Sequence, residues 1–282
     1  MEIVSPGAQE TLPPYALTEA LAARVTALGM EDNLKQMREE GYTVLRDVAP
    51  IETTDRIREA VLRLSQETEG RARGRSASML LGRDPVFEEV VLNAKLQVLV
   101  EHMCGKGALL SQLIASIRPR GAPALALHAD QNWTPAPFPD HNQLLTACWA
   151  CDDFSEPGGA TKVIPRSHLH RRHPSPKEIE ASEGAIAVEC PKGSLPVWDG
   201  SVWHGNYPRQ ADGERVVVHI TFSRLALRTV ENYDHLDEKW LDGKPHELSV
   251  MLGREDFLGS TTIERGFADY TKLPNTFAWA KT

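Results

Sequence analysis

The sequence predicts a mainly β fold with helical support, an α+β class in which a helical front packs on an antiparallel barrel or sandwich. Two observations predict it. Up to residue 107 the apolar residues recur mostly at helical spacing, and after residue 107 strand-like segments follow one another. Short pieces rich in turn residues separate these segments, which is typical of antiparallel β folds and not of alternating βα units.

The front half divides into helical segments around one strand. Helical spacing predicts helices over 16–30, 32–40 and 85–103 and another that begins at Thr53 or Thr54, with a strand over 42–48. Helix 85–103 has a clear start, because Asp84 can cap the first turn and Pro85 fits the first helical position.

The β half shows a useful alternation in its last strand. Its predicted strands are 109–117, 124–128, 143–151, 160–164, 185–190, 195–198 and 215–223. In strand 215–223 one face is apolar and is expected to meet the helices, whereas the face that carries Arg215, His219 and Thr221 is expected to line the interior. Gln112 and Ser116 share the more polar face of strand 109–117, and Arg118, the next residue of the chain, continues this face. Polar residues turned inward predict a wet or ligand-filled interior.

Composition points to a small-molecule partner. A formal charge of -8 and a pI near 5.7 argue against nucleic-acid binding, and no stretch is long enough to span a membrane.

The start of the chain does not resemble a signal peptide, and four cysteines are too few for a disulfide scaffold, so we expect reduced thiols and a cytoplasmic location. Cys148 and Cys151 match the C-x-x-C spacing, but residues three apart on a strand face opposite sides. Nothing in the sequence indicates a homo-oligomer, although one is possible.

The segment His128-Ala129-Asp130 ends an apolar strand and carries the chemistry. Side chains two residues apart share a strand face, so these two ligands supply two thirds of a 2-His-1-carboxylate triad for iron(II). His204 is the best third ligand, because a strand and an Asp-Gly turn deliver it next to Gly205. His219 is the weaker choice, since a lone histidine on a strand is more often a hydrogen-bonded core residue. Arg215 follows His204 by eleven residues and could grip the far carboxylate of a dicarboxylate cosubstrate.

These residues, the segment 159–168 and the strand at 41–46 together resemble the phytanoyl-CoA dioxygenase family of iron(II)/2-oxoglutarate oxygenases over about residues 35–224. The resemblance implies a double-stranded β-helix, or jelly roll, and a single oxygenase domain over 1–282. Its expected parts are a mainly helical front at 1–107, a jelly-roll core at 108–224 and a C-terminal extension at 225–282.

The resemblance also implies the roles of the site residues. It assigns iron(II) to His128, Asp130 and His204, the 5-carboxylate of 2-oxoglutarate to Arg215, and a position near the cosubstrate to Thr161. Gln112, on an inward face, is a further candidate for cosubstrate binding. Dioxygen is the second cosubstrate. One departure is Arg166, where the family commonly has a glycine, and it is expected to alter the mouth of the site without affecting the metal.

We therefore expect a dioxygenase that hydroxylates or otherwise oxidises a small, largely apolar organic substrate, releasing succinate and carbon dioxide. Asp130 favours hydroxylation over halogenation, because halogenating relatives carry a small residue at that position. Trp133 and Gln131 are the candidate substrate contacts, although Trp133 could equally pack on the barrel rim. Two alternatives stay open. A zinc hydrolase also uses two histidines and a carboxylate but leaves Arg215 unexplained, and a noncatalytic β-barrel binding protein could retain the triad as a clip.

Overall fold

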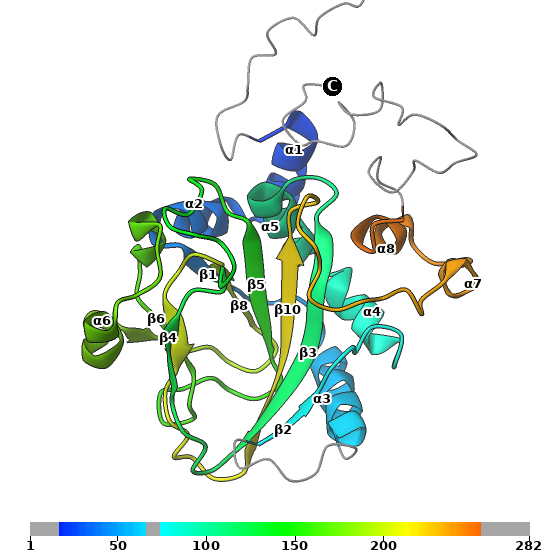
Figure 1. Ribbon diagram of the computed structural model, residues 1–282. Coiled ribbons are helices and arrows are strands. Elements are labelled where there is room, and N and C mark those ends of the chain that lie inside the picture. Colours follow the sequence, from blue (N-terminus) through cyan, green and yellow to red (C-terminus); the bar gives the residue numbers. More distant parts are fainter. Residues whose placement is uncertain (1–16, 66–73, 255–282) are drawn as a thin grey trace, which may run out of the picture.

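Two antiparallel sheets face each other in a computed structural model that describes residues 17–65 and 74–254 (Figure 1). The larger sheet has six strands in the order β1 (Tyr42–Leu45), β8 (Leu195–Asp199), β5 (Leu144–Ala150), β10 (Glu214–Ser223), β3 (Leu109–Pro119) and β2 (Arg75–Ala77). The smaller sheet has four, in the order β4 (Leu125–His128), β9 (His204–Asn206), β6 (Thr161–Val163) and β7 (Ile186–Ala187). This is a jelly roll with helical support, so the predicted fold class is confirmed.

The helices of the front half cover the outer face of the larger sheet. They are α1 (Glu19–Leu28), α2 (Glu31–Glu40), α3 (Ile51–Ser65), α4 (Val86–Val91) and α5 (Ala94–Cys104). Later in the chain come the 3-10 helix η2 (Ser167–His170) and the helices α6 (Pro176–Ala181), α7 (Glu238–Leu241) and α8 (His246–Met251). Within the ranges that the structure describes, no helix combines the length and apolar character needed to cross a bilayer.

The single helix predicted over 85–103 is in fact two. Asn93 interrupts it: its side chain accepts a hydrogen bond from the backbone N–H of Leu96 and caps α5. Asparagine competes with the helix in this way because its short side chain bonds nearby backbone groups. The carboxylate of Asp84 accepts from the N–H of Val86 at 3.0 Å, but α4 begins at Val86, so Pro85 takes the cap position in place of the predicted first helical position. Helix α3 begins at Ile51, slightly before the predicted start.

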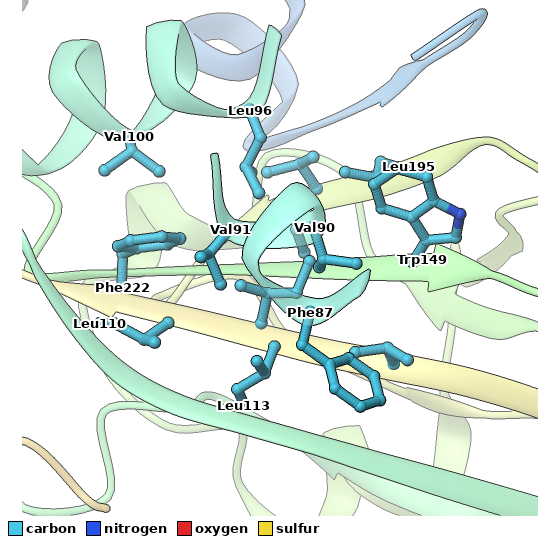
Figure 2. Packing of buried hydrophobic residues seen from close by; sticks show 14 of the residues in the cluster. Phe87, Val90, Val91, Leu96, Val100, Leu110, Leu113, Trp149, Leu195 and Phe222 are labelled. Atoms are coloured by element: carbon cyan, nitrogen blue, oxygen red, sulfur yellow. The ribbon is translucent and has the colours of Figure 1, made fainter. Parts of the chain in front are cut away.

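Strand β10 separates two cores, as its alternation predicts. Its apolar face, with Val216, Val218, Ile220 and Phe222, belongs to the core shared with the helices. Figure 2 shows this packing from close by, with labelled side chains from α4 (Phe87, Val90, Val91), from α5 (Leu96, Val100) and from the sheet (Leu110, Leu113, Trp149, Leu195, Phe222). Val217, on the other face, belongs to the core between the two sheets. The interior face of β10 is therefore available to carry a site.

The two cysteines of the C-x-x-C pattern lie in different cores. Cys148 packs between the sheets, whereas Cys151 packs on the helical side, and both are buried free thiols. The prediction that these two side chains face opposite sides of the strand is confirmed, because they belong to different cores.

Candidate metal centre

Three ligand-type side chains meet where β4 pairs with β9. His128 is the last residue of β4 and lies directly opposite His204, the first residue of β9. The two imidazole rings are 4.3 Å apart between centroids. Asp130 Oδ1 lies 3.4 Å from His204 Nε2 and 3.7 Å from His128 Nε2. One ligand atom from each of the three residues lies within 4.8 Å of the other two, so the cluster could hold a metal ion.

Backbone carbonyls fix the orientation of both rings. Nδ1 of His128 lies 3.0 Å from the carbonyl oxygen of Ala126, and Nδ1 of His204 lies 3.0 Å from that of Val202. A carbonyl can only accept, so each Nδ1 carries the proton and each Nε2 keeps its lone pair for a cation. Such outer hydrogen bonds are characteristic of metal-binding histidines.

The carboxylate of Asp130 is held through one oxygen only. Its Oδ2 accepts from the hydroxyl of Thr146 at 2.8 Å and from the indole N–H of Trp198 at 3.2 Å. This leaves Oδ1 to face the two imidazoles. Burial by itself raises the pKa of Asp130, but His204, His128 and the Thr146 hydroxyl outweigh burial and hold this pKa well below its usual range. With the proton of each ring on Nδ1, the cluster presents two Nε2 atoms and one carboxylate oxygen, which is a donor set that fits iron(II).

Gly205 allows β9 to approach β4 closely. A Cβ atom at this position would overlap the carbonyl oxygen of Leu125. The room that this glycine leaves is taken by the backbone of β4. The close approach is what brings His204 opposite His128.

Arg215 lies at the start of β10 and is 1% exposed. Its guanidinium donates to the carbonyl oxygen of Gly159 and lies over the ring of Phe154, 4.7 Å from its centroid. Within 17–65 and 74–254 it forms no ion pair, and its Nε has no hydrogen-bond partner. Burial and the nearby Arg118 lower the pKa of Arg215 to about 10. This buried cation is therefore suited to receive an anionic group.

The other two candidates for cosubstrate binding lie on interior faces. Thr161 is 2% exposed and is two residues from Val163, the cross-strand partner of His204. Gln112 lies opposite Thr221, whose hydroxyl is 3.4 Å from that of Thr146. Gln112 is thus nearer the metal cluster along β3, whereas Arg215 is near the other end of the same strand pair.

The candidate substrate contacts differ in exposure. Trp133 is 55% exposed, whereas Gln131 is fully buried and its amide donates to the hydroxyl of Ser201. The substrate-binding role of both residues stays a prediction. His219, the weaker candidate for the third ligand, lies 2.9 Å from the hydroxyl of Ser116 and 3.1 Å from the sulfur of Cys148. Burial lowers its pKa to about 4, so it is a neutral, hydrogen-bonded interior residue.

Sequence reasoning missed Thr146 and Trp198, the two residues that hold Asp130. They are 16 and 68 residues away from it along the chain, so no local pattern connects them. One signal was present in the sequence: Thr146 is the one hydroxyl residue in the otherwise apolar run 144–150, all of which is buried.

A jelly roll with two histidines and an aspartate on and beside paired strands defines the class of non-haem metal oxygenases that carry a 2-His-1-carboxylate site. The chain belongs to the phytanoyl-CoA dioxygenase family, whose model matches residues 37–217. It is accordingly an iron/2-oxoglutarate-dependent oxygenase, with iron(II), 2-oxoglutarate and dioxygen as its cofactors. The resemblance inferred from the sequence is confirmed.

Relatives in sequence include an uncharacterised protein of Mycobacterium tuberculosis, Rv1501, and one of Mycobacterium bovis, Mb1539. Each is 25% identical over 206 residues, which is 68% of this chain and 75% of the relative.

Solved structures with the same fold are more distant in sequence. HygX from Streptomyces hygroscopicus, with nickel and 2-oxoglutarate bound, has a TM-score of 0.61 at 15% identity, covering 76% of this chain and 94% of HygX. EctD from S. alaskensis, in its apo form, has a TM-score of 0.61 at 17% identity, covering 72% of this chain and 79% of EctD. SnoK, a carbocyclase from nogalamycin biosynthesis, has a TM-score of 0.59 at 14% identity, covering 73% of this chain and 89% of SnoK.

Proposed function

We propose that the chain hydroxylates, or otherwise oxidises, a small and largely apolar organic substrate, with iron(II) held by His128, Asp130 and His204. The observation that carries this proposal is the convergence of two Nε2 atoms and one carboxylate oxygen, while the remaining polar atoms of the three side chains are hydrogen-bonded. When bound, iron(II) with 2-oxoglutarate and dioxygen supplies the oxidising chemistry and yields succinate and carbon dioxide.

The protein's share at the metal end is to keep three donor atoms in place. The carbonyls of Ala126 and Val202 keep a proton on each Nδ1, so neither ring can turn without losing a hydrogen bond. Thr146 and Trp198 occupy the second oxygen of Asp130, which favours a single-oxygen contact to the metal. Coordination positions on the opposite face then stay open for the cosubstrates.

At the other end, Arg215 would bind the 5-carboxylate of 2-oxoglutarate. Its planar guanidinium can donate two parallel hydrogen bonds to a carboxylate, and burial removes the competition of water. Phe154 supports the guanidinium from one side, which fixes its plane. The hydroxyl of Thr161 and the amide of Gln112 are the further polar groups that would contact the cosubstrate.

The substrate would enter beside His128, where Trp133 offers an exposed aromatic surface. Small organic molecules occupy related folds: HygX has been crystallised with hygromycin B, and EctD with 5-hydroxyectoine. Asp130 favours hydroxylation over halogenation, because its carboxylate occupies the position that a halide would need. The free cysteines support a cytoplasmic location, where thiols stay reduced.

Anaerobic spectroscopy tests the proposal. Adding iron(II) and then 2-oxoglutarate to the folded protein is expected to produce a visible metal-to-ligand charge-transfer band, and admitting air is expected to bleach the band and release succinate. A protein that binds iron but gives neither the band nor succinate would be a binding protein. A protein that retains zinc in preference and hydrolyses an ester or amide would be a hydrolase. Either result would overturn the proposal.

A further inference from the structure

Arg215 has a second arginine directly opposite it. In the register of the antiparallel pair β3 and β10, the Cα partner of Arg215 is Arg118. Figure 1 shows the two strands lying side by side along their length. Directly opposite residues of paired strands project from the same face, so Arg118 and Arg215 both belong to the interior side of the larger sheet.

This pair of arginines lacks a counter-ion. Like charges directly opposite each other destabilise a sheet, yet neither arginine forms an ion pair with any residue of 17–65 and 74–254. The Nε atoms of both are buried and without a hydrogen-bond partner. Arg118 donates one hydrogen bond, to the carbonyl oxygen of Pro123. Burial, and the neighbouring Arg209, lower the pKa of Arg118.

Two exposed or half-buried arginines near this pair do have carboxylate partners, whereas the buried Arg209 donates only to backbone carbonyls. Nη2 of Arg75 lies 2.7 Å from Oε2 of Glu214, and Nη1 of Arg120 lies 2.6 Å from Oδ1 of Asp212. Asp152, the carboxylate that raises the pKa of Arg215, is itself engaged by Arg58 at 3.0 Å and by a backbone N–H. The described residues therefore provide carboxylate partners for Arg75 and Arg120 but none for Arg118 and Arg215. A bound anion could provide that partner. Leaving the buried charge of Arg215 uncompensated is costly, and an anionic ligand between the two arginines would compensate it.

We propose that Arg118 and Arg215 together bind the far carboxylate of 2-oxoglutarate, so that Arg118 is a second cosubstrate-binding residue. This inference rests on the proposed function. A carboxylate has about four lone-pair positions on its two oxygens and can accept from two guanidinium groups at once. The consequence is specificity: a 2-oxo acid without a second carboxylate leaves the buried Arg215 and the half-buried Arg118 without a counter-ion and binds weakly.

Calorimetric titration of nickel-loaded protein in the absence of oxygen tests the assignment. The probes are 2-oxoglutarate and 2-oxopentanoate, which has the same chain length but no second carboxylate. Losing one charge-assisted hydrogen bond in Arg118→Gln is expected to weaken 2-oxoglutarate binding about tenfold. Binding of 2-oxopentanoate and of nickel is expected to stay unchanged. The matched control is Arg120→Gln, since Arg120 is two residues away, exposed and already paired; it is expected to bind both acids as the wild type does.

Melting temperature separates this role from a structural one. In the absence of cosubstrate, Arg118→Gln relieves repulsion and is expected to melt no lower than the wild type, but to gain less from added 2-oxoglutarate. If Arg118→Gln fails to fold, Arg118→Lys keeps the charge and loses the planar fork, and a selective loss of 2-oxoglutarate affinity is still expected.

The outcomes are distinguishable. Wild-type protein that binds neither 2-oxo acid would overturn the proposed function itself. Wild-type protein that binds 2-oxoglutarate, with Arg118→Gln binding it equally or losing both acids alike, would overturn only the assignment of Arg118.

Discussion

The space between the two sheets has the cluster of His128, Asp130 and His204 at one end and the pair Arg118 and Arg215 at the other, and the two ends differ in how their polar atoms are hydrogen-bonded. At the metal end, every polar atom that does not face the centre of the cluster has a hydrogen-bond partner within the chain. At the arginine end, the Nε atoms of Arg118 and Arg215 are buried without hydrogen-bond partners, and neither guanidinium forms an ion pair with any residue of 17–65 and 74–254. The outer hydrogen bonds of the metal cluster are thus formed within the chain, whereas the buried Nε atoms of the two arginines lack partners. Changes at the metal end should therefore affect metal binding, and changes at the arginine end should affect cosubstrate binding alone.

The largest effect is expected from His204→Ala. The substitution removes one of the three proposed metal ligands, so succinate formation should fall to background and nickel affinity should drop by at least about 100-fold. Equilibrium dialysis with nickel and a succinate assay measure both quantities. His246→Ala, an exposed histidine at the start of α8, serves as the control. Unchanged turnover in a folded His204→Ala protein would mean that the distal ligand lies elsewhere.

Arg215→Gln is expected to have the next largest effect, and only at the other end. Hydrogen bonds to charged groups contribute about 1.5–3 kcal/mol, so 2-oxoglutarate affinity should fall by about 10- to 100-fold. Nickel affinity should be unchanged. Titration of both ligands into the same sample checks the separation between the two ends. A parallel loss of nickel binding would show that Arg215 also affects the metal site, so that the two sites do not act independently.

How far the site could be predicted depends on the sequence distance between partners. His128 and Asp130 could be identified because a strand places residues two apart on one face, and the two faces of β10 could be read in the same way. The pairing of Arg118 with Arg215 could not, because it depends on the register between β3 and β10. A shift of one residue would turn Arg118 to the helical side.

The break between α4 and α5 shows the same limit in the helical half. The apolar spacing continues through Asn93, so periodicity alone predicts one helix. The competing preference of a single asparagine for a cap position, strengthened by its hydrogen bond to the carbonyl of Val48, decides the outcome. That bond spans 45 residues and exists only once the chain has folded. Local patterns therefore identify faces and ligands, whereas the residues that hold them in place depend on tertiary pairing.

A smaller effect at the metal end is expected from Thr146→Val, which removes one of two hydrogen bonds to Asp130 with little change in volume. Losing an outer-shell partner typically reduces metal affinity by about 10- to 100-fold, and the remaining bond from Trp198 places this variant near the lower figure. The nickel dissociation constant is the measurement. Thr221→Val is the matched control, because its hydroxyl lies near Thr146 without contacting Asp130. Equal losses in the two variants would mean that the hydroxyl of Thr146 acts through packing and not through Asp130.

The smallest effect concerns stability and its dependence on pH. Asp199 is the last residue of β8, directly before the turn that leads to His204, and burial raises its pKa to about 6. A carboxyl group whose pKa is higher in the folded state than in the unfolded state contributes stability below about pH 4, and this contribution is lost as the pH rises through about 6. Asp199→Asn cannot ionise, so its melting temperature should exceed that of the wild type at pH 8 and approach it near pH 4. Metal-free protein is the proper sample, because a bound cation would add its own stabilisation. A wild type that gains stability between pH 4 and pH 8 relative to Asp199→Asn would show that the turn is stabilised by the charged carboxylate, and that the metal end keeps a second negative charge behind Asp130.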